Sequence, residues 1–482
     1  MLDTPLAGGR PAGLIALLCA ALVSGCAAVG PDYAQPQLPV PAGWTAAADQ
    51  HPADAAVLAT WWRQFDDPVL DRLIADALAA NPGLAEARAR LREARARRGA
   101  AGAQLAPSVD ASLSGSTATG SSQTGSGATR ELYRAGFDAS WELDVFGGLR
   151  RGVEAAQAEM EASVESLRDT RLSLAAEVAL NYIDLRTAEE RLAIAEASIA
   201  ARSENHEIIH WRQQAGLVSE LDLAQATTDL ASTRAALPLL RAAAVEAKNR
   251  LAVLLGRNPG ELEDRLAAGD RVVLLGRAAA VGIPADTLRQ RPDVRAAERR
   301  LAAETARLGE AEAARYPSFR LSGTLGLEAL ELDALTDSGA DTRSLVGGIT
   351  APIFNAGRIA ANIDIQDARL EQARQAYRAT VLTALEEVEN ALTAVAETRA
   401  RRARLTEATT AAQTTLQIAQ HRYQSGLADF LSVLDAQRTQ LSLDEQLAGS
   451  SGELARARIR LYKALGGGWS PAADLLSAKE PQ

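Results

Sequence analysis

The sequence repeats itself once along its length, and this duplication constrains the possible folds more than any other feature. Aligning the chain with itself places Pro82 on Pro292, an offset of 210 residues (292 − 82). The same offset holds, almost without gaps, for several further pairs: Leu91 and Leu301, Pro107-Ser108 and Pro317-Ser318, Glu177-Val178 and Glu387-Val388, Gly216-Leu217 and Gly426-Leu427, Leu255-Gly256 and Leu465-Gly466. A constant offset marks a duplicated structural unit. We predict two copies of one design, at residues 70–256 and 290–466, joined by a connector at 257–289.

Each copy contains two segments with the alternation of a half-buried β-strand. In residues 133–145 the odd positions are Tyr, Ala, Phe, Ala, Trp, Leu and Val, and the even positions are polar or Gly. A period of two indicates a strand with one apolar face. We predict strands at about 107–116 and 133–146, joined by a solvated Gly/Ser loop at 115–129, and at about 317–328 and 344–354. Such strands suit a wall between lipid and water.

Four strands cannot close a barrel by themselves, because about eight strands are the minimum. An open sheet edge also cannot face hydrocarbon, where its backbone groups would stay unpaired. Several chains must then share one barrel, and three copies would supply twelve strands. The alternative is a soluble four-stranded sheet with one wet face.

Long helices follow each pair of strands. Residues 149–214 and 357–424 contain no Pro and are rich in Ala, Leu, Glu, Arg and Gln, which favour helices. At 1.5 Å per residue, a helix of this length spans about 100 Å. Shorter helices at 217–255 and 427–465 are expected to return and form an antiparallel hairpin in each copy. Heptad-like spacing favours coiled-coil seams over a globular core, as in the series Leu174, Val178, Asn181 and Leu185.

Composition excludes several classes of function. The chain has 51 Lys and Arg against 61 Asp and Glu, a net charge of −10, whereas nucleic-acid binding needs clustered cations. Its two cysteines, Cys19 and Cys26, leave neither a disulfide framework nor a thiolate metal site in the body of the chain. No phosphate-binding loop or nucleophile elbow occurs. We predict no nucleic-acid partner, no enzymatic activity and no cofactor beyond a covalent lipid.

The covalent lipid is predicted from the first residues. The apolar run at 14–23 is too short to span a bilayer, which takes about 20 residues, and fits the core of a signal peptide. It ends in Val23-Ser24-Gly25-Cys26, which resembles the bacterial lipobox. We predict a signal peptide at 1–25 and a lipidated N-terminal segment at 26–69, with diacylglycerol and an N-acyl chain on Cys26 that anchor it stably. The alternative is an ordinary secretory signal with an incidental cysteine.

Two further observations predict where the mature protein is located. Ala27 stands where an Asp would follow the lipidated cysteine, and resemblance to lipoproteins of Gram-negative bacteria then implies transfer to the outer membrane. No later stretch reaches 18 consecutive apolar residues, so any further membrane contact must use strands. The last residues, 467–482, are expected to form a tail.

Together these features resemble the TolC-like outer-membrane factors, in the lipoprotein branch of OprM-type efflux proteins (the NodT family). The matching motifs extend through nearly the whole mature chain: Cys26 to Tyr33, Trp61-Trp62, Trp141 to Gly147, Arg291 to Arg295, Tyr316-Pro317, Pro352 to Asn355, and Leu461 to Trp469. The resemblance implies an α+β membrane protein: a homotrimer with a twelve-stranded outer-membrane barrel, four strands per chain, and a long periplasmic coiled-coil barrel closed at its inner tip.

The resemblance also implies the function. The protein would be the exit duct of a tripartite efflux system, passively exporting drugs or other small solutes. An inner-membrane pump, expected to be of the RND type, and a periplasmic adaptor (membrane fusion) protein would deliver them. The alternatives are a TolC-like exit channel for type I polypeptide secretion and a purely structural coiled-coil lipoprotein of the envelope.

The same resemblance assigns a periplasmic gate to the hairpin turns. Alignment to residues 426–438 implies that Asp435 is the ring carboxylate, Leu431 the apolar constriction and Arg438 a gate-linking arginine. In the first copy, Asp222 is implied as the acceptor for Tyr423 across the closed tip.

The physical effect of such a ring can be stated in advance. Three symmetric carboxylates near an axis would attract cations, and their mutual repulsion would raise their pKa values. Ala428 and Ser432 stand where some relatives carry a basic residue or a second carboxylate, which leaves the strength of the gate open. On spacing alone, Asp435 is a solvated helix residue or cap beside a turn.

One motif points to a different class of protein. His206-Glu207-Ile208-Ile209-His210 fits the H-E-x-x-H pattern of zinc peptidases, with two imidazoles one helical turn apart. The second copy carries no such residues at the equivalent positions, and neither His51 nor His421 lies in a recognisable third-ligand motif. We interpret the motif as a solvated helix face and predict no metal site.

Overall fold

The structure is a computed structural model that describes residues 28–37, 39–45, 55–263, 266 and 284–469. The predicted signal peptide, Cys26, most of the predicted connector and most of the predicted tail lie outside the described residues. The chain divides into two compact units. The first contains the residues up to Gln37, Arg90–Val164 and Ala296–Arg378, and the second contains Leu38–Ala89, Glu165–Arg295 and the residues from Ala379 onward.

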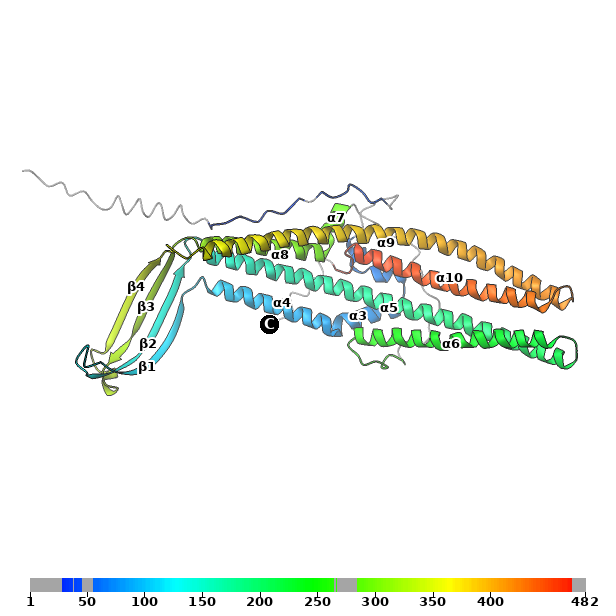
Figure 1. The fold of residues 1–482 in the computed structure, drawn as a ribbon, viewed down its shortest axis with the longest axis horizontal. Helices are drawn as coiled ribbons and strands as arrows, with labels where there is room; N and C mark the ends of the chain where they lie inside the picture. Colours follow the sequence, from blue (N-terminus) through cyan, green and yellow to red (C-terminus); the bar gives the residue numbers. More distant parts are fainter. Residues whose placement is uncertain (1–27, 38, 46–54, 264–265, 267–283, 470–482) are drawn as a thin grey trace, which may run out of the picture. The chain divides into compact units, whose positions relative to one another are not determined.

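A single antiparallel sheet forms the strand part of the first unit. Its strands, in the order β1-β2-β3-β4, are β1 (Ser108–Thr119), β2 (Thr129–Leu143), β3 (Ser318–Ala329) and β4 (Asp341–Thr350). Figure 1 shows them side by side, so β1 and β4 are the two edges. The number of strands and the α+β class agree with the prediction.

Several strand boundaries differ from the sequence prediction. The Gly/Ser tract was predicted as loop, yet β1 continues to Thr119 and β2 begins at Thr129, where the two hydroxyls lie 2.9 Å apart. Small residues and threonine offer no steric barrier to a ladder, so pairing extends until the turn itself. In the other hairpin, β4 ends at Thr350, ahead of Pro352, which has no N–H to donate to a ladder.

The sheet has one apolar face, as the alternation predicted. Phe137 of β2 lies opposite Ala111 of β1 and Leu325 of β3, and all three side chains project to the same side. The other side carries polar pairs such as Arg134 with Glu328. Most large side chains of the apolar face are exposed in the single chain, notably those of Val109, Leu113, Phe137, Leu325, Leu345 and Ile349. Apolar patches of this kind mark a surface that something else covers.

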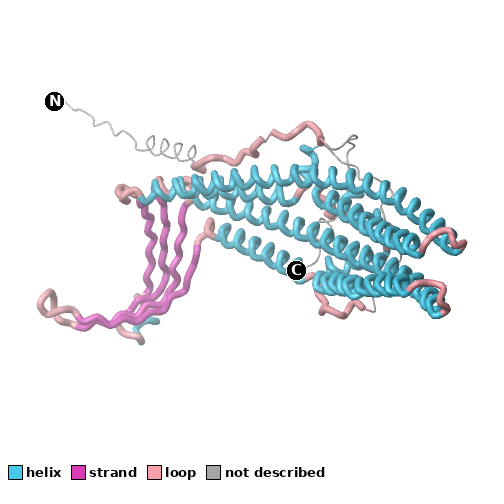
Figure 2. The backbone as a smooth tube through the Cα atoms, turned by 45° about the vertical axis from the view of Figure 1, so that its right-hand side comes forward, coloured by secondary structure: helices cyan, strands magenta, loops and turns pink. Residues whose placement is uncertain are grey.

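Two helical hairpins make up most of the second unit, and their long helices begin within the residues of the first. The long helices α5 (Gly148–Gln214) and α9 (Arg358–Gln424) have 67 residues each, and α6 (Glu220–Leu254) and α10 (Phe430–Ala464) have 35 each. Figure 2 shows each long helix followed by a shorter one that runs back along it. None of the helices among the described residues is both apolar enough and long enough to cross a membrane.

Short helices precede the strands in each copy. They are α2 (Ala55–Ala59), the 3-10 helix η1 (Trp61–Phe65), α3 (Pro68–Ala80) and α4 (Pro82–Ala103) in the first copy, and α7 (Pro284–Gln290) and α8 (Pro292–Ala313) in the second. A further 3-10 helix, η2 (Asp333–Thr336), lies between β3 and β4.

The repeat preserves one junction in detail. At the break between α3 and α4, the Asn81 side chain donates a hydrogen bond of 2.8 Å to the Leu254 carbonyl at the end of α6. At the break between α7 and α8, Arg291 donates one of 2.9 Å to the Ala464 carbonyl at the end of α10. Arg291 and Ala464 stand 210 positions after Asn81 and Leu254. Different side chains in the two copies therefore satisfy the equivalent unpaired carbonyl at the end of the returning helix.

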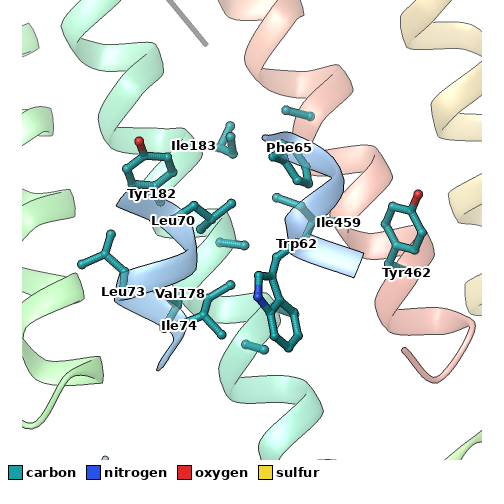
Figure 3. Close-up of a cluster of buried hydrophobic side chains, with 14 of the residues drawn as sticks. Trp62, Phe65, Leu70, Leu73, Ile74, Val178, Tyr182, Ile183, Ile459 and Tyr462 are labelled. Carbon is teal, nitrogen blue, oxygen red and sulfur yellow. The ribbon is translucent and has the colours of Figure 1, made fainter. Parts of the chain in front are cut away.

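The second unit contains a packed apolar core, which the sequence analysis did not anticipate. Trp62, Phe65 and Leu70 pack with Val178 and Ile183 of α5 and with side chains of α10 (Figure 3). Trp61 is fully buried and stacks on Tyr462 with ring centroids 5.5 Å apart. The prediction of coiled-coil seams in place of a globular core was therefore only partly right, because the segment before α4 adds buried apolar side chains to one cluster with the hairpin helices. On the predicted seam, Leu174, Val178 and Leu185 are buried, while Asn181 is half-buried.

Gly256 offers a test of the junction that the two copies share. It has φ +68°, and a Cβ added there would lie 2.5 Å from the Ala80 carbonyl oxygen. Gly260 has φ +91° with nothing within 4 Å, so it is a matched control for backbone strain alone. Left-handed backbone costs about 1–2 kcal/mol for alanine, and forced overpacking adds about 1–3 kcal/mol. We expect Gly256→Ala to lower the thermal midpoint of helix loss by circular dichroism clearly more than Gly260→Ala; equal shifts would contradict the close packing.

Candidate functional site

The two hairpin turns have the same backbone design. Gly216 and Gly426 both have φ +72°, a left-handed conformation that glycine adopts without a Cβ clash. After each glycine, the next amide donates back to the helix: Leu217 to the Arg212 carbonyl and Leu427 to the Arg422 carbonyl, each over 2.8 Å. These bonds satisfy the last carbonyls of α5 and α9 and reverse the chain sharply.

The returning helices begin with the same two residue types in opposite order. Ser219 caps α6, and its hydroxyl and amide both donate to Asp222 Oδ2, over 2.7 and 2.9 Å. Asp429 caps α10 and accepts from the hydroxyl and amide of Ser432, over 2.6 and 3.1 Å. The hydrogen bonds from Ser432 lower the pKa of Asp429. Capping hydrogen bonds therefore stabilise both turns, and Asp222 is already engaged in a helix cap.

A small apolar cluster joins the two hairpins near their turns. Its buried members come from three helices: Ile209 of α5, Ala226 of α6, and Phe430, Val433 and Leu434 of α10. Tyr423 of α9 packs against it, with its ring centroid 5.6 Å from that of Phe430. The turns are thus held together by packing as well as by polar contacts.

Tyr423 bonds to an arginine of the other hairpin. Its hydroxyl accepts a hydrogen bond of 2.9 Å from Arg212 Nη1, and the Arg212 guanidinium lies 5.3 Å from the ring centre. Burial raises the pKa of the Tyr423 hydroxyl above its ordinary value, the nearby charge of Asp222 adds to this, and Arg212 opposes it. Tyr423 therefore stays neutral at physiological pH and acts as a hydrogen-bonding group.

The strongest polar contact near the turns is a buried carboxylate shared by two arginines. The Asp229 side chain on α6 is only 3% exposed; Arg202 of α5 forms an ion pair with one oxygen, and Arg438 Nε of α10 lies 2.8 Å from the other. We call Arg202, Asp229 and Arg438 the arginine–aspartate cluster. Burying a lone carboxylate costs several kcal/mol, and the two arginines offset this cost because each pairs with one of the Asp229 oxygens. The cluster ties α6 to α10.

Asp435 and Leu431 face outward from this cluster. Asp435 is 66% exposed, and its carboxylate lies 3.8 Å from Arg438 Nη1, one helical turn away. Leu431 is exposed, as are Leu217 and Leu427 at the two turns. An exposed carboxylate beside exposed leucines leaves these side chains available to whatever meets the hairpin ends.

The five residues assigned from the resemblance all lie on or beside the turns. Arg438 contacts Asp435 as well as Asp229. In the single chain the Tyr423 hydroxyl is bonded to Arg212, while Asp222 caps α6, and the Tyr423–Asp222 link stays a prediction.

Sequence reasoning missed Asp229, Arg202 and Arg212. A signal for Asp229 existed: the buried residues of α6 follow a heptad-like seam through Ala226, Leu230 and Thr233, and Asp229 lies beside it. A carboxylate beside an apolar seam indicates a buried ion pair. Arg202 and Arg212 carried no such signal, because arginines are frequent on all the long helices.

The H-E-x-x-H motif forms a polar helix face. The rings of His206 and His210 stack with centroids 6.5 Å apart. A ring nitrogen of His206 lies 3.0 Å from the Thr227 hydroxyl, and one of His210 lies 3.2 Å from the Gln214 amide. Among the residues that the structure describes, no group of three or more His, Cys, Asp or Glu side chains is arranged to hold a metal ion.

Comparison with known proteins gives one consistent result. The family described as Outer membrane efflux protein matches residues 73–257 and 283–467, which correspond closely to the two copies of the repeat. Outer membrane protein OprJ of Pseudomonas aeruginosa is 31% identical over 471 residues, covering 97% of this chain and 98% of OprJ. Solvent efflux pump outer membrane protein SrpC of Pseudomonas putida is 32% identical over 458 residues, covering 93% of this chain and 97% of SrpC.

A solved structure is also similar to this chain along most of its length. The outer-membrane channel OprN superimposes with a TM-score of 0.87 at 37% sequence identity, and the match covers 92% of this chain and 100% of OprN.

Removing one arm of the arginine–aspartate cluster should loosen the hairpin ends. Arg438→Ala leaves Asp229 paired with Arg202 but removes the contact to α10. A hydrogen bond to a charged group contributes about 1.5–3 kcal/mol, so the local opening equilibrium should rise roughly 10- to 150-fold. We expect faster hydrogen exchange of the amides at the start of α6 and α10, measured by mass spectrometry. The control is Arg404→Ala, whose ion pair with Glu407 is highly exposed. Equal exchange in both variants would show that the cluster does not hold the ends.

Proposed function

The chain belongs to the outer membrane efflux protein family, and we propose that it is the exit duct of a tripartite pump with a periplasmic adaptor and an inner-membrane pump of the RND type. In such a system the outer-membrane channel and the pump carry out different parts of transport. The chain itself supplies a passive path, and energy is supplied elsewhere. It needs no catalytic group for this role.

The observation that carries this proposal is the sheet. Its apolar face is exposed in the single chain, and its edge strands β1 and β4 each pair on one side only. The exposed apolar face is unfavourable in water, and the unpaired edges are costly in hydrocarbon, so a single copy suits neither environment. Three copies, edge to edge, would complete a twelve-stranded barrel with its apolar face toward lipid, which is the arrangement of a porin-like wall.

The segment after Cys26 supports the proposed lipid anchor. The Val29 amide donates a hydrogen bond of 3.0 Å to the carbonyl of Phe146, a residue between β2 and α5. Arg151 of α5 donates a hydrogen bond of 3.1 Å to the Val29 carbonyl and forms an ion pair of 2.7 Å with Asp32. The chain just after the cysteine is thereby held at a strand-to-helix junction, where the strands of a barrel leave the membrane. A lipid on Cys26 would lie at that membrane surface.

We assign the gate to the hairpin ends. Asp435 and Leu431 would form the ring and the constriction, since both are exposed beside the turns. Arg438 and Tyr423 would hold the closed state through their contacts with Asp229 and Arg212, and Asp222 is proposed as a further acceptor once the copies assemble. A ring of Asp435 carboxylates would favour cations.

The proposed cargo is small solutes. SrpC is named for solvent efflux, and this chain resembles it along nearly its whole length. A wide passage selects little, so the pump and the adaptor would decide which solutes are exported.

Weakening the gate should open the channel. Asp435→Ala with Tyr423→Phe removes the exposed carboxylate and the hydroxyl that bonds to Arg212. Losing the Tyr423–Arg212 hydrogen bond, whose donor is charged, is worth about 1.5–3 kcal/mol, a roughly 10- to 150-fold change in the ratio of closed to open states, and the exposed Asp435–Arg438 pair adds little. We expect a higher open probability in planar lipid bilayers and weaker cation preference.

The control makes the same two chemical changes away from the turns. Glu407 is an exposed carboxylate on α9, and Tyr377 is a buried tyrosine of the same helix. Glu407→Ala with Tyr377→Phe should conduct like the unaltered protein. The gate assignment fails if the Asp435/Tyr423 variant is no more open than this control.

The lipid anchor can be tested separately. Cys26→Ser removes the acceptor thiol, so metabolic labelling with radioactive palmitate should disappear. Trimers should still form, because strands and helices carry the assembly, and native mass spectrometry in detergent measures this. Labelling that persists would refute the anchor, and a purely monomeric Cys26→Ser protein would show that lipid drives assembly.

A further inference from the structure

The internal repeat contains information about a contact that lies outside the single chain. We propose that β4 of each copy pairs with β1 of the neighbouring copy in one defined register, with Thr350 opposite Ser112 of the neighbour. This inference rests on the proposed three-chain barrel and goes beyond it, because a barrel can close in several registers.

The two hairpins of the sheet are structurally equivalent. In the first, Ser108 of β1 lies opposite Ser140 of β2. In the second, Ser318 of β3 lies opposite Thr350 of β4. Both strands of the pair advance by 210 residues (318 − 108 and 350 − 140), which is the offset of the sequence repeat. β1 therefore corresponds to β3, and β2 corresponds to β4, residue by residue.

The ladder between β2 and β3 is the joint where one copy of the repeat meets the other. In that ladder, Ser140 lies opposite Ser322. Moving Ser140 forward by the repeat offset gives Thr350 on β4. Moving Ser322 back by the same offset gives Ser112 on β1. If the joint between chains follows the joint within a chain, Thr350 pairs with Ser112 of the next copy.

This register is consistent with the chemistry of both edges. It places Ile349 opposite Leu113 of the neighbour on the apolar face, and these side chains are 70% and 79% exposed in the single chain. It places the hydroxyls of Thr350 and Ser112 together on the polar face. A slip by one residue would put Leu113 opposite a polar-face position, which the pleat forbids in a lipid-facing wall. Alternation thus excludes odd shifts, and the repeat selects among the even ones.

The register also accounts for an exposed segment after β4. The strand β2 continues to Leu143, which pairs with Phe319 of β3. Its counterpart by the repeat is Ile353 (143 + 210), which lies beyond the end of β4 and is 92% exposed. In the proposed register Ile353 lies opposite Val109 of the neighbour, so a second copy would cover it. Pro352 withholds one donor from that stretch without preventing the side-chain contact.

Cysteine pairs can test the register on the intact protein. Residues directly opposite in an antiparallel ladder have Cα atoms about 4.5–5.5 Å apart, within the reach of a disulfide. Diagonal neighbours two residues away lie about 7–8 Å apart, beyond easy reach. We expect Ser112→Cys with Thr350→Cys, oxidised with copper phenanthroline in outer membranes, to give covalent trimers on non-reducing gels. Each single-cysteine variant should give none.

Matched controls come from the chain itself. Ser140→Cys with Ser322→Cys places the same chemistry at the equivalent joint within one chain, and should form an intrachain disulfide without changing the mass. Ser112→Cys with Gly348→Cys, and Ser114→Cys with Thr350→Cys, shift the proposed pairing by two residues in either direction. Both shifted pairs should cross-link far less than the central pair.

The outcomes separate the register from the barrel. Preferential cross-linking of a shifted pair would overturn the register while leaving the three-chain barrel intact. If the internal control closes but none of the intermolecular pairs does, and native mass measurement finds monomers, the barrel itself is wrong. Trimeric mass without cross-linking at any of the three pairs would also overturn the register, since closure would then use other strands or other pairings.

Discussion

An unpaired strand edge in hydrocarbon is the constraint on which the rest of this protein depends. Each unsatisfied N–H or C=O costs several kcal/mol where no water can replace the missing partner. The described part of the chain forms four strands with two edges and one exposed apolar face, and these strands cannot satisfy their own backbone in a membrane. Assembly is therefore part of folding for the strand region. A helical hairpin has no such need, because its backbone bonds are internal.

The two copies of the repeat share backbone conformations, but different side chains at equivalent positions give them different contacts. Backbone features are shared: the left-handed glycines at the turns and the covered carbonyls at the ends of α6 and α10. Some polar side chains beyond the turns are not shared. The counterparts of Asp229 and Arg438 are Thr439 and Thr228, so the arginine–aspartate cluster occurs once per chain and not twice. A gate built from three such chains would contain this cluster once within each chain and would leave the joints between chains to other contacts.

Much of the fold followed from local rules. Alternation identified the four strands, and uninterrupted helix-forming composition identified α5 and α9 almost to their ends. The middle of the Gly/Ser tract is loop, as predicted, but its two ends were misjudged, because pairing with a partner strand overrides the preference of their residues for loops. The core around Trp61 was not anticipated, because its contacts join residues hundreds of positions apart. At the turns, the resemblance led to Asp435, Leu431, Arg438, Tyr423 and Asp222, but not to Asp229 or Arg212, which bond to two of them.

The sequence alone determined the duplication, the strand alternation, the helix lengths and the positions of the turns, since each depends on residues close together in the chain or on a constant offset. Only the tertiary structure decided which side chains meet. It paired Arg438 with a buried Asp229 and Tyr423 with Arg212, and it placed Val29 at the junction between β2 and α5. Such pairings depend on how each packed helix is rotated about its own axis. A rotation by one residue, about 100°, would bring different side chains into every contact.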